Sequence, residues 1–362
     1  MATQALPGSL IFVDDHSSGI TRTKVRHGWG YFDADGDRIK DRDEIDRLNA
    51  IGMPPAYEHC WFCPDPNGHI QAVGYDAKGR KQYRYHPDFR THQEDAKYEQ
   101  LAAFGHALPK LRRKVDADIA GRAMRADTVI AAVVRLIDTT HIRVGNEQYA
   151  KDNKSFGATT LRNRHAKVSG GKLMLSYVGK SGKKRIVTVT DRNLVRIARR
   201  TQDLPGQNLF EFVDSDGAAR PVTSGDVNAY IKDAMGDDFT AKNFRTWGAS
   251  VIAFTGIADS EDAKLGMKTI IEPVADALGN TVAISRRSYV HPALIEALKD
   301  AGAIGDAKLP RAARYLSPHE RGLIDFLKAL PSAQAKAKAR ARSEGQAAAR
   351  AEALLKAAAK AA

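Results

Sequence analysis

The sequence is short of cysteine, of long apolar runs and of nucleotide-binding motifs. Its 362 residues contain no apolar run of about 18 residues, the length that a membrane-spanning helix requires. The N-terminus, residues 1–7, lacks the basic start and the apolar stretch of a signal peptide, so we expect a cytosolic protein. There is no Gly-x-x-x-x-Gly-Lys-Ser/Thr loop, which excludes a P-loop site for ATP.

The two cysteines, Cys60 and Cys63, form a single Cys-x-x-Cys pair. Such a pair is typical of a redox centre or of half a zinc site, and His59 and His69 flank it. Adjacent residues on a strand point to opposite faces, so His59 and Cys60 would point apart. The two aromatic residues between the thiols favour packing. We therefore expect no metal and no cofactor, with zinc as the alternative.

Positive charge is what the sequence has in excess. It contains 56 Lys and Arg against 43 Asp and Glu, which gives a formal net charge of +13. This excess indicates a polyanionic partner, because Lys and Arg displace counterions from phosphates. The length predicts two domains with a tail, since domains commonly hold about 100–200 residues.

The N-terminal hundred residues are predicted to be mostly β-structure. Short aromatic runs at 28–32 and 59–62 alternate with turn clusters, and a short helix is predicted from Arg42 to Ile51. The segment from Asp33 to Glu44 also places carboxylates as an EF-hand loop does. Arg38, however, stands where that loop needs glycine. We predict a hairpin turn, with calcium binding as the alternative.

Residues 79–86 mix basic and aromatic side chains at strand spacing. The two faces of this strand would carry Arg80, Gln82 and Arg84 on one side, and Lys81, Tyr83 and Tyr85 on the other. Long cations and phenol groups suit duplex DNA, where they reach phosphates and groove edges. The alternative is an ordinary solvent-facing strand whose tyrosines pack in the core.

From about Asp95 the apolar spacing becomes helical, and Pro109 followed by a basic run is expected to interrupt the helix. We place the domain junction there. The predicted organisation is a β-rich domain at 1–105, a linker at 106–120, a larger and mainly helical domain at 121–330, and a tail at 331–362. The fold class is α+β. The tail is rich in alanine, with seven basic and two acidic residues, and is predicted to be a loosely helical or disordered basic arm.

Within the larger domain, a helix at 122–140 is followed by three antiparallel strands at 165–168, 172–178 and 185–190. Lys180 lies at the tip of the second hairpin, with Lys183 beside it. A solubilising turn lysine is the alternative for Lys180. Further helices are predicted at 246–257, with Arg245 entering the first turn, at 270–277, and at 318–330.

Four of these residues, Arg143, Lys180, Arg245 and Tyr289, occur in the order that suits one reaction. Cleaving a phosphodiester adds negative charge to the phosphate, and the planar arginine fork suits that charge. A tyrosine phenol can attack the phosphorus if cations surround it, and a lysine can protonate the departing sugar oxygen. In so basic a chain, this order alone also arises by chance.

The surrounding residues make the hypothesis specific. The chain resembles the type IB DNA topoisomerases of the small bacterial and poxvirus-like group across residues 25–295. The matching segments are Gln71–His86, Arg143–Glu147, Phe156–Arg162, Tyr177–Lys180, Phe244–Gly248 and Leu278–Thr281, ahead of Tyr289.

The resemblance implies a role for each residue. Tyr289 would form a 3′-phosphotyrosyl bond, Arg143 and Arg245 would hold the scissile phosphate, and Lys180 would protonate the 5′ oxygen. Lys242 occupies the position of a lysine near the phosphate. Asn280 aligns with a histidine of the poxvirus members and would donate a neutral hydrogen bond. The implied duplex contacts come from Arg80, Lys81, Tyr83, Tyr85 and Lys183.

The implied activity is the relaxation of positive and negative supercoils without ATP or metal. It would be carried out by a monomer that clamps duplex DNA on the nucleoid. A tyrosine site-specific recombinase is the first alternative, although its usual His-x-x-Arg is here Lys242-x-x-Arg245. A non-enzymatic basic DNA-binding protein is the second.

Overall fold

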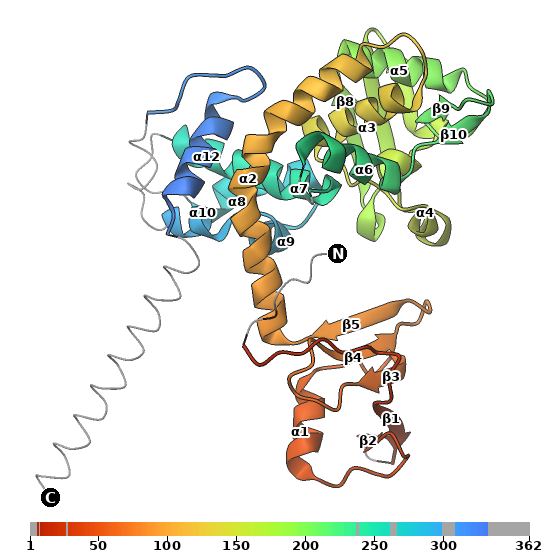
Figure 1. Ribbon diagram of the computed structural model, residues 1–362, viewed down its shortest axis with the longest axis vertical. Helices are drawn as coiled ribbons and strands as arrows, with labels where there is room; N and C mark the ends of the chain where they lie inside the picture. Colours follow the sequence, from red (N-terminus) through yellow and green to blue (C-terminus); the bar gives the residue numbers. More distant parts are fainter. Residues whose placement is uncertain are drawn as a thin grey trace, which may run out of the picture. The chain divides into compact units, whose positions relative to one another are not determined.

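The computed structural model describes residues 6, 8–26, 28–236, 239–260, 266–298 and 308–331. All but the first residue of the predicted basic tail lies outside these ranges. The chain divides into two units, residues 1–98 and residues 99–362 (Figure 1). The first unit carries an antiparallel sheet and the second is mainly helical, so the predicted α+β class is confirmed.

The N-terminal unit is built on a five-stranded antiparallel sheet of order β2-β1-β3-β4-β5. Its strands are β1 (Ile20–Val25), β2 (Gly28–Phe32), β3 (Glu58–Phe62), β4 (Ile70–Tyr75) and β5 (Lys81–Tyr85). One face is closed by helix α1 (Arg42–Ala50), whose Leu48 shares a small core with Phe62 and Ala72. The predicted helix in this region is therefore confirmed.

The acidic segment that begins at Asp33 is a turn, as predicted. The Asp33 side chain accepts hydrogen bonds at Oδ1 from the backbone N–H groups of Asp35 (3.1 Å) and Asp37 (2.9 Å). Glu44, the last carboxylate of the calcium-loop pattern, is paired with Arg47 at 2.6 Å. The two end carboxylates of that pattern are thus engaged with the protein itself.

Helix α2 (Pro87–Ile119), the long orange helix of Figure 1, contains most of the segment predicted as a linker. Leu108, Leu111 and Val115 are buried in the core of the second unit, and Pro109 lies inside the helix rather than interrupting it. A proline inside a helix costs about 3 kcal/mol. Burial of each large aliphatic side chain contributes about 1.5–3 kcal/mol, so packing outweighs that cost.

Helix α7 (Ala241–Ala258) lies at the centre of the second unit (Figure 1). It contacts α3 (Ala126–Thr140), α6 (Ser224–Met235), α8 (Met267–Leu278), α10 (Pro292–Ala297) and α12 (Pro318–Ala329). It is buried on most of its surface, including Phe244, Trp247 and Phe254. Besides most of α2, the other described α-helices of this unit are α4 (Glu147–Asn153), α5 (Arg192–Gln202) and α9 (Val282–Ser288). Among the described residues, no helix has the length and apolar character needed to cross a membrane.

The predicted three-stranded sheet is present, in the order β6-β7-β8. Its strands are β6 (Ala166–Ser169), β7 (Lys172–Val178) and β8 (Lys184–Val189), while β9 (Glu211–Val213) and β10 (Ala219–Pro221) form a separate hairpin. Along β7, Leu173, Leu175 and Tyr177 are buried and the residues between them are exposed. One face of the sheet therefore belongs to the core, and the other faces solvent.

A buried ionic network joins four helices of this unit. Arg112 of α2 donates to Asp138 of α3 (2.8 Å) and to Glu320 of α12 (2.8 Å). Trp247 of α7 donates from its indole nitrogen to the same Glu320 carboxylate at 3.2 Å. Trp247 is 2% exposed and therefore packs in the core.

Candidate active site

A pocket in the second unit brings together residues from five separate parts of the chain. Of the predicted site residues, it is lined by Arg143, Lys180, Lys183, Arg245 and Asn280. Four of these five side chains are cationic, and one of the four, Arg245, is deeply buried. The pocket is therefore suited to an anion.

Arg143 lies in the loop after helix α3, and backbone hydrogen bonds hold this loop in place. Its carbonyl oxygen accepts a hydrogen bond from Ala158 N–H (2.8 Å), and that of Val144 accepts one from Thr159 N–H (2.7 Å). The motifs Arg143–Glu147 and Phe156–Arg162, separate in sequence, are thus one local structure. This pairing leaves the Arg143 side chain directed into the pocket.

Tyr289 lies at the end of α9 and is held by backbone contacts on both sides. Its N–H donates to Ser285 O at 3.1 Å. The N–H of His291, two residues on, donates to Ser250 Oγ of the central helix α7 at 3.1 Å. The imidazole of His291 is buried and accepts a hydrogen bond from Ala293 N–H at 3.1 Å, where it caps α10.

The Tyr289 phenol meets two guanidinium groups. Arg143 Nη2 donates to Tyr289 Oη at 3.1 Å, and Arg245 Cζ lies 5.0 Å from the centroid of the ring. Burial acts to raise the pKa of Tyr289, but the charges of Arg245 and Arg143 outweigh it and lower the pKa below its ordinary value. Because the phenolate is the nucleophilic form, these two arginines make Tyr289 more reactive near neutral pH.

Arg245 is 4% exposed and is held by two carbonyl groups. It donates from Nη1 to His141 O and from Nη2 to Leu278 O, the latter at 3.0 Å. Burial, together with the charge of Arg143, lowers the pKa of Arg245 to about 10. The helix that carries it begins at Ala241, so Arg245 lies deeper in α7 than the predicted first turn. Two crowded, poorly hydrated cations are stabilised when an anion binds between them.

The carbonyl that holds Arg245 depends on a close contact with α7. His141 ends α3 with a left-handed backbone (φ 54°). Its imidazole lies directly against Gly248, where an added Cβ atom would stand 2.3 Å from the ring. A side chain at position 248 would therefore displace the His141 ring or helix α7, next to the carbonyl that holds Arg245.

Lys180 lies at the tip of the β7–β8 hairpin, as predicted. The tip is a short turn, η3 (Lys180–Gly182), in which Ser181 has a positive φ of 64°. Lys180 and Lys183 are both exposed, and both line the pocket. The pocket therefore places two candidate proton donors on a projecting hairpin.

Asn280 follows the glycine that ends α8. Its backbone N–H donates to Ala275 O at 3.0 Å. Its side-chain Nδ2 is buried and has no hydrogen-bond partner among the described residues. An unsatisfied buried donor in a cationic pocket is suited to an anionic oxygen. Lys242, by contrast, is exposed in the first turn of α7 and does not line the pocket.

Sequence reasoning missed Arg185, which also lines the pocket. It lies on β8, where it is the cross-strand partner of Tyr177. The alternation of residues along β8 could have indicated it, because Arg185 lies on the same inward face as Val187 and the buried Val189. A cation on the inward face of a strand needs partners inside the protein.

The predicted faces of β5 in the N-terminal unit are confirmed. Tyr83 and Tyr85 are stacked with ring centroids 5.8 Å apart, and Lys81 Nζ lies 5.4 Å from the Tyr83 ring. On the other face, Arg80 and Gln82 both donate to Asp76. Tyr83 and Tyr85 are 39% and 40% exposed, so these rings are available to a partner rather than packed in a core.

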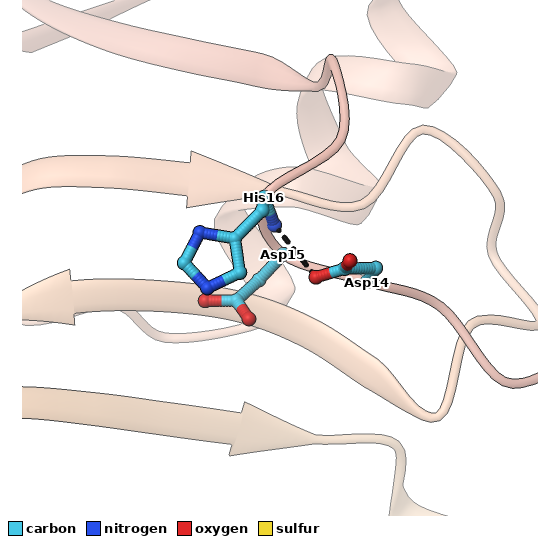
Figure 2. A group of neighbouring side chains, drawn as sticks. All are labelled: Asp14, Asp15 and His16. Carbon is cyan, nitrogen blue, oxygen red and sulfur yellow. Dashed lines mark hydrogen bonds between the residues drawn. The ribbon is translucent and has the colours of Figure 1, made fainter.

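The Cys-x-x-Cys pair offers a metal little access. Both thiols are buried, and burial raises the pKa of each. The group of metal-ligating side chains found in the described part of the chain is instead Asp14, Asp15 and His16 (Figure 2). There the His16 N–H donates to Asp14 Oδ1 at 3.0 Å, and Asp15 is paired with Lys81. These carboxylates thus already have protein partners.

Comparisons with known proteins identify the family of this chain. The family model described as "Eukaryotic DNA topoisomerase I, catalytic core" matches residues 86–303, and that described as "Bacterial DNA topoisomerase IB, N-terminal domain" matches residues 28–76. DNA topoisomerase 1B of Acanthamoeba polyphaga mimivirus is 33% identical over 285 residues, which cover 75% of this chain and 85% of the relative. DNA topoisomerase 1B of Vaccinia virus (strain Copenhagen) is 23% identical over 251 residues, which cover 67% and 76%.

Among solved structures, the post-cleavage complex of the XerH site-specific recombinase with its palindromic difH substrate covers 52% of this chain and 49% of that one. The TM-score is 0.36 and the identity 17%, which is too slight a likeness to support an argument. The family evidence is of a different strength. Since the catalytic-core model spans more than half of the residues, and a relative is 33% identical over three quarters of them, the chain belongs to the type IB DNA topoisomerases, a family of isomerases.

Proposed function

We propose that this protein relaxes supercoiled duplex DNA by cutting one strand through Tyr289 and resealing it. The observation that carries the proposal is the contact of the Tyr289 phenol with two arginines, Arg143 at 3.1 Å from Oη and Arg245 at 5.0 Å from the ring. Such a pair both activates a phenol and compensates the charge of a phosphate. The other pocket residues follow from the needs of the same reaction.

In the cleavage step, the Tyr289 oxygen forms a bond to phosphorus, and the bond from phosphorus to the 5′ oxygen breaks. The phenol gives up its proton to solvent, and Lys180 supplies a proton to the departing 5′ oxygen. The products are a 3′-phosphotyrosyl ester and a free 5′ hydroxyl. The number of phosphoester bonds is unchanged, so resealing by the reverse attack needs no ATP.

Fixed cations stabilise the charge that develops on the non-bridging oxygens. Arg143 and Arg245 hold these oxygens, and Asn280 donates its unpartnered Nδ2–H to one of them. Lys242, exposed at the start of α7 and outside the pocket lining, would add positive charge at longer range rather than a direct contact with the phosphate. With this set of fixed donors, the reaction proceeds without a divalent metal.

We further propose duplex DNA as the partner, a monomer as the active form, and the nucleoid as the place of action. The net charge of +13 supports a polyanion. In the N-terminal unit, the stacked Tyr83 and Tyr85 would touch the duplex with Lys81 beside them, and Arg80, on the opposite face of the strand, would add a further phosphate contact. Lys183 would add a phosphate contact next to Lys180. Rotation of the free 5′ end about the intact strand would release supercoils of either sign.

The test is relaxation of a negatively and a positively supercoiled plasmid in buffer with EDTA and without ATP. We expect relaxation of both by the wild type, and none by Tyr289→Phe, which keeps the ring and lacks the nucleophile. Denatured wild-type protein should remain attached to the 3′ end of the cleaved strand. A recombinase would instead exchange paired sites and leave a plasmid without them supercoiled. Unaltered activity in Tyr289→Phe would refute the proposal.

A further inference from the structure

Arg185 ties the hairpin that carries Lys180 to the end of helix α8. Its Nη1 donates to Asp276 O at 2.7 Å, and its Nη2 donates to Ala277 O at 2.7 Å. These acceptors are among the last carbonyl groups of α8, which carry its negative dipole end. Asp276 O also accepts a hydrogen bond from the Gly279 N–H at 3.2 Å. A planar guanidinium is matched to two neighbouring carbonyls, as a lysine ammonium is not.

The two structures that Arg185 joins differ in how firmly they are held. Helix α8 is anchored in the core by buried side chains that include Ile271, Val274 and Leu278. The tip of the hairpin, from Lys180 to Lys183, is exposed throughout. Arg185 lies just behind that tip. The end of α8 is thus the fixed support, and the hairpin is the part that needs docking.

The backbone of α8 leaves room for this contact. The helix ends at Gly279, whose φ is +66°, and an added Cβ atom there would stand 2.6 Å from Arg185 Nη1. The next residue is Asn280, another member of the pocket. Arg185 therefore packs on the turn that presents Asn280, and it fixes the base of the hairpin beside that turn.

We infer that Arg185 is a positioning residue that docks the hairpin so that Lys180 can protonate the departing 5′ oxygen. Both Nη atoms donate to backbone carbonyls at the end of α8, and Arg185 belongs to the hairpin itself, whereas Arg245 lies against the Tyr289 ring. The role of Arg185 is therefore assigned through Lys180. The inference rests on the proposed function and adds to it a requirement for the proton donor. A misplacement of about 1 Å in such a group can slow a reaction by about 100-fold.

The effect on rate should follow from this geometry. Arg185→Ala should slow single-turnover cleavage by about 100-fold. Arg185→Lys should recover little, since one ammonium cannot bridge both carbonyls. The double variant Lys180→Ala/Arg185→Ala should be no slower than Lys180→Ala alone, because the two changes remove one step. Lys172→Ala, an exposed cation on β7, is the matched control and should cleave as the wild type does.

The deciding experiment replaces the scissile 5′ oxygen of a duplex substrate by sulfur. A thiol has a pKa of about 8.5, far below that of an alcohol, so the sulfur leaves without a proton donor. We expect Arg185→Ala and Lys180→Ala to cleave this substrate within about tenfold of the wild type. Arg143→Ala, whose defect lies at the phosphate and the nucleophile, should stay slow.

The outcomes separate this inference from the function beneath it. If the wild type cleaves neither substrate, the proposed function fails. If the sulfur rescues Lys180→Ala but not Arg185→Ala or Arg185→Lys, the function stands and the docking role of Arg185 is wrong. The inference would also be overturned if Arg185→Ala cleaved the oxygen substrate at the rate of the wild type. Far-UV circular dichroism and thermal unfolding of each variant establish that it is folded before these rates are compared.

Discussion

Arg143 Nη2 donates a hydrogen bond to Tyr289 Oη across 3.1 Å, although 146 residues separate the two in sequence. Each partner is positioned by its own element, Arg143 by the loop after α3 and Tyr289 by the end of α9. Because arginine keeps its proton, this bond is charge-assisted and favours the ionised phenol. The chemistry of the site thus depends on how two independently packed segments meet.

The rate of DNA cleavage should rise with pH as the Tyr289 phenol ionises. Burial acts to raise the pKa of Tyr289, yet Arg245 and Arg143 hold it below the ordinary value. In Arg143→Gln one of these cations is lost, so the rising limb of the profile should move to higher pH. Single-turnover rates over a pH series measure this shift. An unmoved limb in the variant would show that Arg143 does not tune the nucleophile.

Arg245→Lys should be a severe change despite the conserved charge. Arg245 spans from His141 O to Leu278 O with two separate nitrogens, whereas a lysine has one. Loss of one fixed donor at a developing anion commonly costs about 100- to 1000-fold in rate. We expect this loss in the cleavage step, with DNA affinity nearly unchanged in a filter-binding assay. Lys268→Ala, an exposed cation on α8, serves as control and should lose neither.

Asn280→Ala should slow cleavage by about 10- to 100-fold, because a hydrogen bond to a charged group is worth about 1.5–3 kcal/mol. Asn280→Asp should be worse than Asn280→Ala, since it adds a negative charge beside the phosphate. The measurement is the single-turnover rate at saturating enzyme. If both variants were as fast as the wild type, the unpartnered Nδ2 would have no part in the reaction.

Arg112→Ala should destabilise the second unit by about 3–5 kcal/mol, because it leaves the buried Glu320 and the partly buried Asp138 without their partner. The matched control is Arg42→Ala, which removes an ion pair whose arginine side chain is 79% exposed. Such exposed pairs contribute about 0–1 kcal/mol. Urea unfolding of each variant gives the free energies. Equal losses in the two variants would contradict the assignment of the network as a structural tie.

The same network predicts that part of the free energy of unfolding is lost at acidic pH. Burial acts to raise the pKa of Glu320, but Arg112 outweighs it and lowers the pKa. A carboxyl whose pKa is lowered on folding stabilises the protein fully above its unfolded pKa of about 4.3. That stabilisation is lost as the pH falls through the folded value. In Glu320→Gln this part of the pH dependence should vanish from urea-unfolding measurements, and its persistence would assign the effect to other carboxyls.

The elements that the sequence predicted best are those with local signals. Alternation of apolar residues gave the three strands with their bounds nearly right, and the glycine-rich turn placed Lys180 at the hairpin tip. The helix predicted at 318–330 is present as α12, and a capping box between Ser317 and Glu320 marks its start. Each of these depends on interactions within a few residues.

What could not be predicted depends on contacts between distant segments. Pro109 was expected to break a helix, because the sequence does not show how firmly its neighbours are packed. Arg185 reaches acceptors that are 91 and 92 residues away, and no local pattern encodes that distance. The resemblance to a family supplied Arg143, Arg245 and Tyr289 as a set, whereas their mutual geometry came from the fold alone.

Gly248 has no side chain, and this leaves the space that the His141 ring occupies. A methyl group there would collide with the His141 ring, so that either this ring or helix α7 would have to shift. One added carbon would then disturb the grip on Arg245 and the aim of Arg143 together. A variant such as Gly248→Ala could thus abolish strand cutting while every reacting group remains in place, and screening only those groups would overlook it.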